Sequence, residues 1–166
     1  MPEVPITKNH AGWIIASILL VAMAALTLWF YSLPSPLSAF GHATSPWNSP
    51  INSHISPGLC LFNRGYFPVR IKSAIAYVGN GVEFVRAEVI RTGISHGIAG
   101  IEGTPADNNI ETRPAEGALI STDGAYTIFF VLRCVGSEQH FDRFVVVYEH
   151  LFKEYTLVKD NLDRGR

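Results

Sequence analysis

One short motif in the chain has the residue types of a serine hydrolase. Residues Gly93-Ile94-Ser95-His96-Gly97 match the pattern G-x-S-x-G, in which a strained turn between a strand and a helix exposes the serine. No helical periodicity follows the motif, and the region is short for the large α/β sheet that such a turn requires. His96 is adjacent to Ser95 rather than positioned as its base. A flexible glycine loop is the better interpretation, and an extracytoplasmic hydrolase using residues 93–97 is the alternative function.

The histidines and acidic residues lack the spacing of a metal site. None of the six histidines forms an HxH or HxxxH pair that would place two imidazoles together. Asp107-Asn108-Asn109 offers oxygen ligands for calcium, but it lacks the spaced acids and the glycine of an EF-hand loop. Copper(I) would favour methionine sulfur, and the chain has only two methionines. We expect no catalytic residue, no metal and no other cofactor, and a metal-handling domain is kept as an alternative.

Cys60 and Cys134 are the only cysteines, and both fall within expected strands. In an oxidising compartment, a bridge between them would pin one sheet to the other and stabilise the fold by roughly 3–5 kcal/mol. Two buried free thiols explain the sequence equally well, because both cysteines lie among apolar neighbours. A disulfide and a pair of free thiols are therefore both open.

Alternating apolar residues predict the strands that carry these side chains. In residues 67–78 (FPVRIKSAIAYV), every second residue is apolar except Ser73. These apolar residues are Phe67, Val69, Ile71, Ile75 and Tyr77. Asn80-Gly81 favours a tight hairpin turn, with residues 82–90 as the returning strand. Residues 125–135 (AYTIFFVLRCV) are apolar on both faces, so we expect this strand at the centre of a sheet. Residues 144–148 and 155–158 form the predicted last hairpin.

Together these strands predict an all-β domain over residues 58–162, an antiparallel β-sandwich of six to seven strands. Its weak part is the glycine-rich stretch 93–117, because loops longer than about 12–15 residues are uncommon in compact domains. Either a short strand lies near residues 97–102 or the loop is functional or mobile, and we favour a partly mobile insertion. The candidate partner-binding residues lie in this loop and are Ser95, His96, Asp107, Asn108 and Asn109.

The chain also contains a candidate membrane span at residues 11–33, which have no charged side chain. A helix of this length rises about 34 Å, enough to cross a hydrocarbon core of about 30 Å. Trp13 near one end and Trp29 and Tyr31 near the other fit the aromatic belts of a spanning helix. A signal peptide cleaved after Ala43 is the competing interpretation, but the apolar run exceeds the roughly 7–15 residues usual there. We predict a retained transmembrane helix.

The flanks of this helix predict its orientation. Lys8 lies in the N-terminal tail, residues 1–10, whereas the other side has no basic residue before Arg64. By the positive-inside rule, we expect a cytoplasmic N-terminus and a C-terminal domain outside the cell membrane. Residues 34–57 are rich in proline and serine and predict a semi-rigid stalk, and residues 163–166 predict a short C-terminal tail.

Composition narrows the range of partners. The net charge is −1, with Lys and Arg scattered among nearly equal numbers of acids, so we expect no nucleic-acid surface. Small residues in the span permit a weak homodimer, although no GxxxG motif is present. The aromatic residues beside turns are expected to cap the core; they include Tyr66, Phe67 and Phe152. We therefore expect a membrane-tethered, non-enzymatic module that binds or supports another membrane or envelope protein.

The order of these segments resembles that of a known group of proteins. A membrane helix and a Pro/Ser stalk precede NRGYFPVRI, and IFFVLRC is followed by a last hairpin. This arrangement is similar to uncharacterised single-pass membrane proteins of Gram-positive bacteria that carry an extracytoplasmic immunoglobulin-like domain. The resemblance implies the sandwich class and no functional residues. The chain departs from antibody domains because its tryptophans, Trp13, Trp29 and Trp47, leave none for the core, and Leu132 occupies the place of the corner tyrosine.

Overall fold

The computed structural model describes residues 10–42, 49–93 and 100–160. The chain forms two compact units, which divide between Pro34 and Ser35. The first unit holds one helix, and the second holds all the described strands. An N-terminal apolar helix followed by an all-β part, as the sequence predicts, is therefore confirmed.

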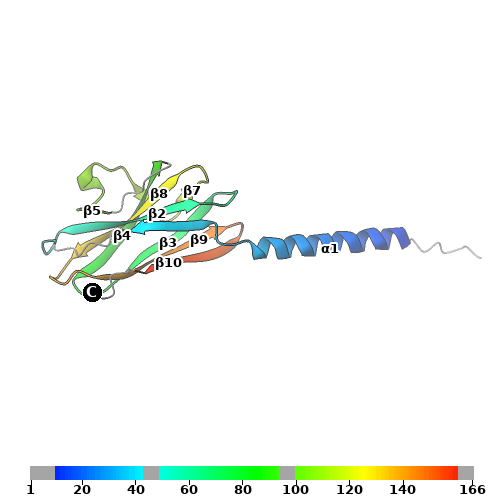
Figure 1. The fold of residues 1–166 in the computed structure, drawn as a ribbon, viewed down its shortest axis with the longest axis horizontal. Helices are drawn as coiled ribbons and strands as arrows, with labels where there is room; N and C mark the ends of the chain where they lie inside the picture. The colour runs from blue at the N-terminus through cyan, green and yellow to red at the C-terminus, as the bar shows by residue number, and fades with distance from the viewer. Residues whose placement is uncertain (1–9, 43–48, 94–99, 161–166) are drawn as a thin grey trace, which may run out of the picture. The chain divides into compact units, whose positions relative to one another are not determined.

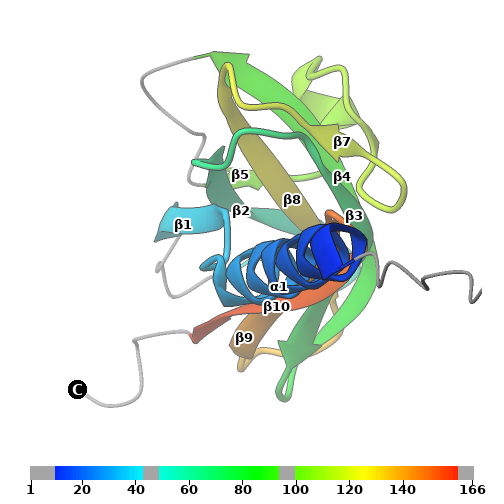
Figure 2. The same ribbon diagram turned by 90° about the vertical axis from the view of Figure 1, so that its right-hand side faces the viewer.

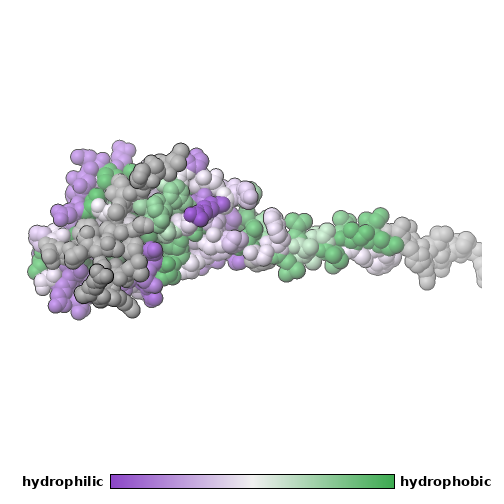
Figure 3. Space-filling model, in the orientation of Figure 1, coloured by the Kyte–Doolittle hydropathy of each residue, from purple (hydrophilic) through white to green (hydrophobic). Residues whose placement is uncertain are grey.

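The first unit is α1 (His10–Ser32), a helix that is predominantly apolar on all sides. Its stretch Gly12–Phe30 is long and apolar enough to cross a membrane, and none of it is buried inside the protein. Figure 3 shows hydrophobic residues along the face of the helix that is turned to the viewer. Leaving apolar surface in water costs about 25 cal/mol per Å², so this helix requires an apolar environment outside the chain. Trp13 and Trp29 are exposed, and the side chain of Tyr31 lies outside the described residues.

The second unit consists of two antiparallel sheets (Figures 1 and 2). Sheet 1 contains, in spatial order, β1 (Leu37–His42), β2 (His54–Asn63), β8 (Ala125–Cys134), β4 (Val82–Gly93) and β6 (Arg113–Pro114), and β5 (Gly100–Glu102) also pairs with β2. Sheet 2 contains, in spatial order, β10 (Lys153–Asp160), β9 (Phe141–His150), β3 (Val69–Val78) and β7 (Leu119–Ile120). A single 3-10 turn, η1 (Ala106–Asn108), lies between β5 and β6 in the chain.

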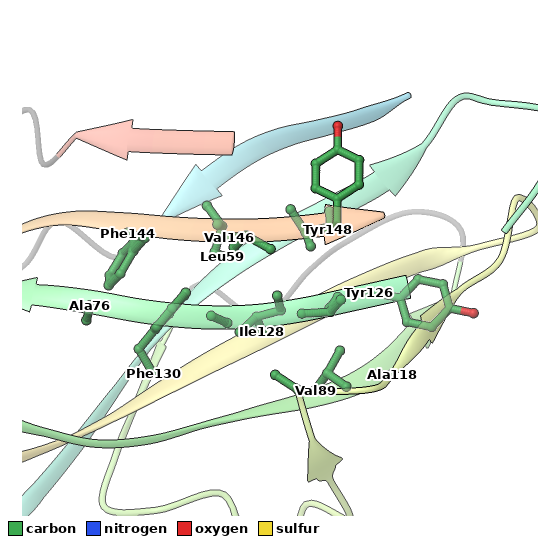
Figure 4. Packing of buried hydrophobic residues seen from close by; sticks show 14 of the residues in the cluster. Leu59, Ala76, Val89, Ala118, Tyr126, Ile128, Phe130, Phe144, Val146 and Tyr148 are labelled. Carbon is green, nitrogen blue, oxygen red and sulfur yellow. The ribbon is translucent and has the colours of Figure 1, made fainter. Parts of the chain in front are cut away.

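The core lies between the two sheets. Phe130 of β8 stacks on Phe144 of β9 with ring centroids 4.2 Å apart, and Phe144 also stacks on Phe141 at 4.8 Å. Figure 4 shows the side chains that meet in this space, among them Ile128 and Phe130 from β8 and Phe144, Val146 and Tyr148 from β9. β8 lies between β2 and β4, and all but one of its residues are buried. This confirms the central strand that its two apolar faces predict.

The hairpin predicted at Asn80-Gly81 is wrong, because β3 and β4 belong to different sheets and the turn carries the chain from one to the other. The loop between β8 and β9 makes the same crossing beside it. The amide of Gly136 donates a hydrogen bond to the carbonyl oxygen of Gly81 at 3.1 Å. The amide of Gly79 donates one to the carbonyl oxygen of His140 at 3.0 Å. The two crossings thus form a closed corner, whose hydrogen bonds replace those that a hairpin makes between its own strands.

A bulge in β3 changes which side chains face the core. The register of β3 with β9 shifts between Ile71 and Ser73. Ile71 is buried before the shift and Ala76 after it, whereas Ile75 and Tyr77 are exposed. The prediction that Ile75 and Tyr77 share the buried face is therefore wrong, because one extra residue in a strand exchanges its two faces. Ser73, the polar interruption in the apolar series, marks the place in the sequence.

The predicted stalk over residues 34–57 is wrong at both of its ends. β1 pairs with the second half of β2, and β2 already begins at His54. Leu37 is buried and Ala39 packs against the core, so alternate residues of this short stretch anchor an edge strand. Proline is compatible with this position because Pro34 and Pro36 precede the strand, where no ladder hydrogen bond is lost. Trp47 lies outside the described residues.

The predicted last hairpin is confirmed by the pairing of β9 with β10. Its turn is made by Leu151 and Phe152, whose φ angles are 50° and 63°. Positive φ at both central positions is typical of the tight hairpin turn that Asn-Gly adopts most easily. This turn therefore holds two bulky apolar residues in the left-handed region that their Cβ atoms disfavour.

Replacing Gly81 by alanine is expected to destabilise the domain. The φ of Gly81 is +79°, and a Cβ built there would lie 2.0 Å from the carbonyl oxygen of Glu138. Gly117 has a φ of +78° but meets nothing within 4 Å, so Gly117→Ala is the matched control for backbone strain alone, about 1–2 kcal/mol. We expect Gly81→Ala to lower the unfolding free energy clearly further, as measured by urea titration of the full chain in detergent. Equal losses in the two variants would contradict the closed corner.

Candidate functional site

The glycine-rich stretch expected as a mobile insertion is folded over its described part. From residue 100 the chain forms β5, η1 and β6 in succession. The alternative of a short strand near 97–102 is confirmed by β5, whereas the partial mobility of the stretch stays a prediction. Ser95 and His96, the candidate residues of the serine motif, lie outside the described residues.

Asp107, Asn108 and Asn109, the remaining candidate partner-binding residues, fold this segment onto itself. The Asp107 carboxylate accepts hydrogen bonds from the amide and the hydroxyl of Thr104, at 2.7 and 2.8 Å. These two bonds hold the pKa of the Asp107 carboxyl below its usual value. The side-chain amide of Asn108 donates to the carbonyl oxygens of Glu102 and Thr104, and Asn109 ends η1 with a φ of 56°. The three side chains thus have a structural role that needs no ligand.

The folded segment crosses the outer face of sheet 1 as a strap. β5 lies beside β2 at one edge of the sheet and β6 lies beside β4 at the other, so residues 103–112 must pass over β8 between them. The Ser56 hydroxyl of β2 donates to the carbonyl oxygen of Gly103 at 2.8 Å. The Thr112 hydroxyl donates to the Glu88 carboxylate of β4 at 2.6 Å. We call residues 103–112 the strap.

The strap explains why β8 is buried on its outer face as well as its inner one. Phe129 and Val131 are fully buried, yet neither belongs to the cluster that fills the space between the sheets. Phe129 lies opposite Gly58 on one side and Glu88 on the other, at the level where the strap is fastened to both strands. Pro105 of the strap is itself buried. The loop expected to bind a partner is therefore a cover for the sheet.

Cys60 and Cys134 are both buried, and no disulfide joins them in the structure. Cys60 lies opposite Thr127 on the outer face of sheet 1, whereas Cys134 belongs to the core between the sheets. The step from Thr127 to Cys134 along β8 spans about 23 Å, and a disulfide requires Cα atoms about 4.4–6.8 Å apart. Of the two alternatives, the free thiols are thus the ones present. Burial raises the pKa of the Cys60 thiol, which a hydrogen bond with Thr127 only partly offsets.

A hollow of about 590 Å³ beside β4 and β7 is lined by polar and apolar side chains, and several of its polar groups are already paired. Arg91 forms an ion pair with Asp123 at 2.8 Å, and Arg113 donates to the carbonyl oxygen of Leu119 at 3.0 Å. The Ser121 hydroxyl donates to Asp123 at 2.6 Å, and this bond is the main cause of the lowered pKa of that carboxyl. Among the described residues, no three His, Cys, Asp or Glu side chains cluster as a metal site. Nothing in this region favours the hydrolase or the metal-handling alternative.

The outer face of sheet 2 carries an apolar patch. Ile75, Val145 and Val158 lie opposite one another across β3, β9 and β10. Ile75 and Val158 are 41% and 50% exposed. Tyr77 and Val147 extend this row on either side along the strands. We call these five residues the outer patch. Sequence reasoning missed it because the interruption at Ser73 was read as one polar residue on a continuous apolar face and not as a bulge that exchanges the two faces.

Charged side chains border the outer patch at both ends. Lys72 forms an ion pair with Glu149 at 2.5 Å, and this contact lowers the pKa of the Glu149 carboxyl. At the other end, the guanidinium of Arg143 lies 4.8 Å from the ring centroid of Tyr77, and Arg143 stands opposite Asp160. An apolar centre with a charged rim is the usual anatomy of a protein–protein interface.

A second exposed group lies at the end of the domain where the β2–β3 connection meets the β9–β10 turn (Figure 1). Tyr66 is 94% exposed and Phe152 is 99% exposed. Phe67 brings the two loops together, since its ring centroid lies 6.5 Å from that of His150. The expectation that these turn aromatics cap the core is wrong for Tyr66 and Phe152. We call Tyr66, Phe67 and Phe152 the aromatic end.

Truncation of Phe129 is expected to reveal whether the strap covers sheet 1. Because Phe129 is fully buried, Phe129→Ala should lower the unfolding free energy by about 3–5 kcal/mol. Val85→Ala is the control, since Val85 on the neighbouring strand is 44% exposed and should change stability by about 0.5 kcal/mol or less. Chemical denaturation measures both. A loss of only about 1 kcal/mol at Phe129 would mean that the strap does not bury this face.

His150 is expected to make stability depend on pH. Its side chain is 6% exposed, and Nε2 accepts or donates no hydrogen bond within the described part of the chain. Burial lowers the pKa of His150, so the folded state favours the neutral ring. The stability it contributes is present above the unfolded pKa of about 6.5 and is lost as the pH falls through the lower folded value. His150→Gln should flatten this loss at pH values below about 6.5; identical pH profiles would contradict it.

Comparison with known proteins identifies no similar protein whose function could guide the interpretation of this one. No family model matches the chain, and no curated protein or solved structure matches it. What the domain does must therefore be inferred from its own surfaces.

Proposed function

We propose that the protein is a membrane-tethered, non-enzymatic binding module that presents the outer patch to another membrane or envelope protein. The observation that carries the proposal is the exposed row Ile75–Val145–Val158 on sheet 2, bordered by charged side chains. Soluble surfaces rarely expose contiguous apolar side chains without a partner. The catalytic alternatives need converging polar groups, whereas Arg91 of the hollow and Asp107 and Thr112 of the strap have partners inside the domain.

An immunoglobulin-like classification of the domain is part of the proposal. The constant-type immunoglobulin order is A-B-E-D in one sheet and G-F-C in the other. The order here is β1-β2-β8-β4 in sheet 1 and β10-β9-β3 in sheet 2. If the long strands are lettered in chain order, β1 is A, β2 is B and so on to β10 as G, and the two orders coincide. The cysteines differ from the antibody pattern because they lie on the strands equivalent to B and E.

The apolar helix supports a retained anchor over a cleaved signal peptide. Cleavage after Ala43 would remove β1, whose Leu37 is buried in the core cluster. It would also remove Ser35, whose hydroxyl is hydrogen-bonded to the buried Tyr148 of β9. A segment that completes the fold of the domain is poorly suited to removal. With Lys8 on the other side of the span, we propose a cytoplasmic N-terminus and an extracytoplasmic domain at the cell membrane.

The tether compensates for the small size of the outer patch. Five side chains cover far less than the roughly 800 Å² that each partner contributes to a stable interface, so binding through this patch alone would be weak. Anchoring both proteins in one bilayer raises their effective concentration, so that even a weak interface is occupied for much of the time. We therefore expect the partner to be anchored in or held at the same membrane.

Site-specific crosslinking in intact membranes tests this function. A photoreactive amino acid replaces Ile75 in the full chain, and the membranes are washed with carbonate before illumination. We expect a discrete adduct with another membrane protein. Adding Val158→Arg should abolish it, because this change places a charge inside the outer patch, beside Val145.

Val85 is the matched control position, because it is an exposed valine on sheet 1 with 44% exposure against 41% for Ile75. Photoreactive residue 85 should give no such adduct. Equal adducts from both positions, or an adduct at 75 that survives Val158→Arg, would refute the outer patch as the interface. An adduct at twice the mass of the chain would identify the partner as a second copy.

A further inference from the structure

We propose that the aromatic end of the domain inserts into the lipid headgroup region beside its own helix, so that the domain rests on the bilayer. The partner in this inference is a lipid surface, and it is distinct from the protein that the outer patch binds. The inference rests on the proposed function, because it requires α1 to anchor the chain in a membrane.

The residue types at the aromatic end suit a bilayer interface and are unfavourable in water. Tyr66 and Phe152 are almost completely exposed, with 94% and 99% of their surface accessible. Aromatic rings settle at the level of the headgroups, where an apolar ring and a polar edge are both accommodated. Three such side chains on two adjoining loops form one contiguous contact.

The backbone of the β9–β10 turn is a second, independent observation. Leu151 and Phe152 both have positive φ, at 50° and 63°. A two-residue turn of this kind is ordinarily made by Asn and Gly, which adopt it without a steric penalty. The turn instead projects a phenylalanine that contacts nothing else in the domain, given its 99% exposure. Strain of this kind at an exposed tip points to a binding role for the projected side chain.

The aromatic end is also the end of the domain where the chain arrives from the helix. The amide of Arg64 donates to the carbonyl oxygen of Pro36 at 2.8 Å. A Cβ built on Gly65 would lie 2.8 Å from the Cβ of Pro36 and 3.5 Å from Nε2 of His150. The loop that carries Tyr66 therefore packs directly against the first residues of the domain and against the base of the β9–β10 turn.

Chain length limits how far the first residue of the domain can lie from the end of the helix. Only Leu33 and Pro34 separate the last helical residue, Ser32, from Ser35, which is fastened to Tyr148. Three Cα steps reach at most about 11 Å, whereas each headgroup layer is about 5–7 Å thick. The loops beside Ser35 are thus held within reach of the headgroups.

The charges at this end favour insertion of the rings over electrostatic attraction. Arg64 is exposed in the β2–β3 connection, and Lys153 follows Phe152 with its ammonium 4.9 Å from the ring centroid of Tyr155. Glu154 comes next and is exposed, so the local charge stays small. We therefore expect docking onto neutral phosphatidylcholine as well as onto anionic lipid.

Depth-dependent fluorescence quenching tests the inference on the full chain. Phe152→Cys is labelled with an environment-sensitive fluorophore and reconstituted into phosphatidylcholine vesicles that contain a spin-labelled lipid quencher. The native cysteines are buried and stay unlabelled in the folded protein. Glu138→Cys is the matched control, because Glu138 is exposed in the loop at the opposite end of β9. We expect at least about threefold stronger quenching at 152 than at 138.

Tyr66→Cys gives a second reading on the other loop and should be quenched like position 152. Equal quenching at 152, 66 and 138 in protein that resists carbonate extraction would overturn the inference and leave the anchored module standing. Release of the chain by carbonate would overturn both the inference and the proposed function. A signal at 152 that depends on the protein-to-lipid ratio and not on the lipid quencher would mean contact with a second copy and would also overturn it.

Discussion

Strand β8 is buried on both of its faces, and most of the domain is arranged to cover it. A strand in the middle of an ordinary sandwich needs one cover, which the opposite sheet provides. β8 needs two, because Phe130 and Ile128 point into the core while Phe129 and Val131 point the other way. Sheet 2 supplies the inner cover through Phe144, and the strap supplies the outer one. The strap in turn uses the side chains of Asp107, Asn108 and Thr112 in its own folding and attachment.

The closed corner has a similar effect on the other half of the domain. Because β3 passes into β4 by crossing between sheets, β3 pairs in sheet 2 with β9, and β4 pairs in sheet 1 with β8. The bulge near Ser73 then turns Ile75 and Tyr77 outward. Two local irregularities thus determine which side of the sandwich is available to a partner. Neither is visible in the average hydrophobicity of the strand.

Sequence patterns were sufficient to predict several of the strands. They were insufficient to predict how the strands are connected. The two apolar faces of residues 125–135 predict a central strand, and the pairing of residues 144–148 with 155–158 follows from alternation and a short turn. The meaning of Asn80-Gly81 could not be predicted, because this dipeptide permits positive φ both in a hairpin and in a crossing between sheets. The distance between the two cysteines depends on which strands become neighbours. An alternating apolar pattern does not determine these neighbours. The outer patch and the aromatic end depend on tertiary context in the same way.

The short connection between Ser32 and Ser35 has a consequence for how such a protein would find its partner. If α1 spans a membrane, a long flexible stalk would let the domain sample a hemisphere above it, whereas two intervening residues would confine the domain to a thin layer. Collision with the partner then becomes a search in two dimensions, governed by lateral diffusion and by the rotation of the anchor about its axis. The height of the binding face above the lipid would then determine which partners can bind. A partner whose contact surface lies farther from the membrane would not bind, even if its side chains were complementary.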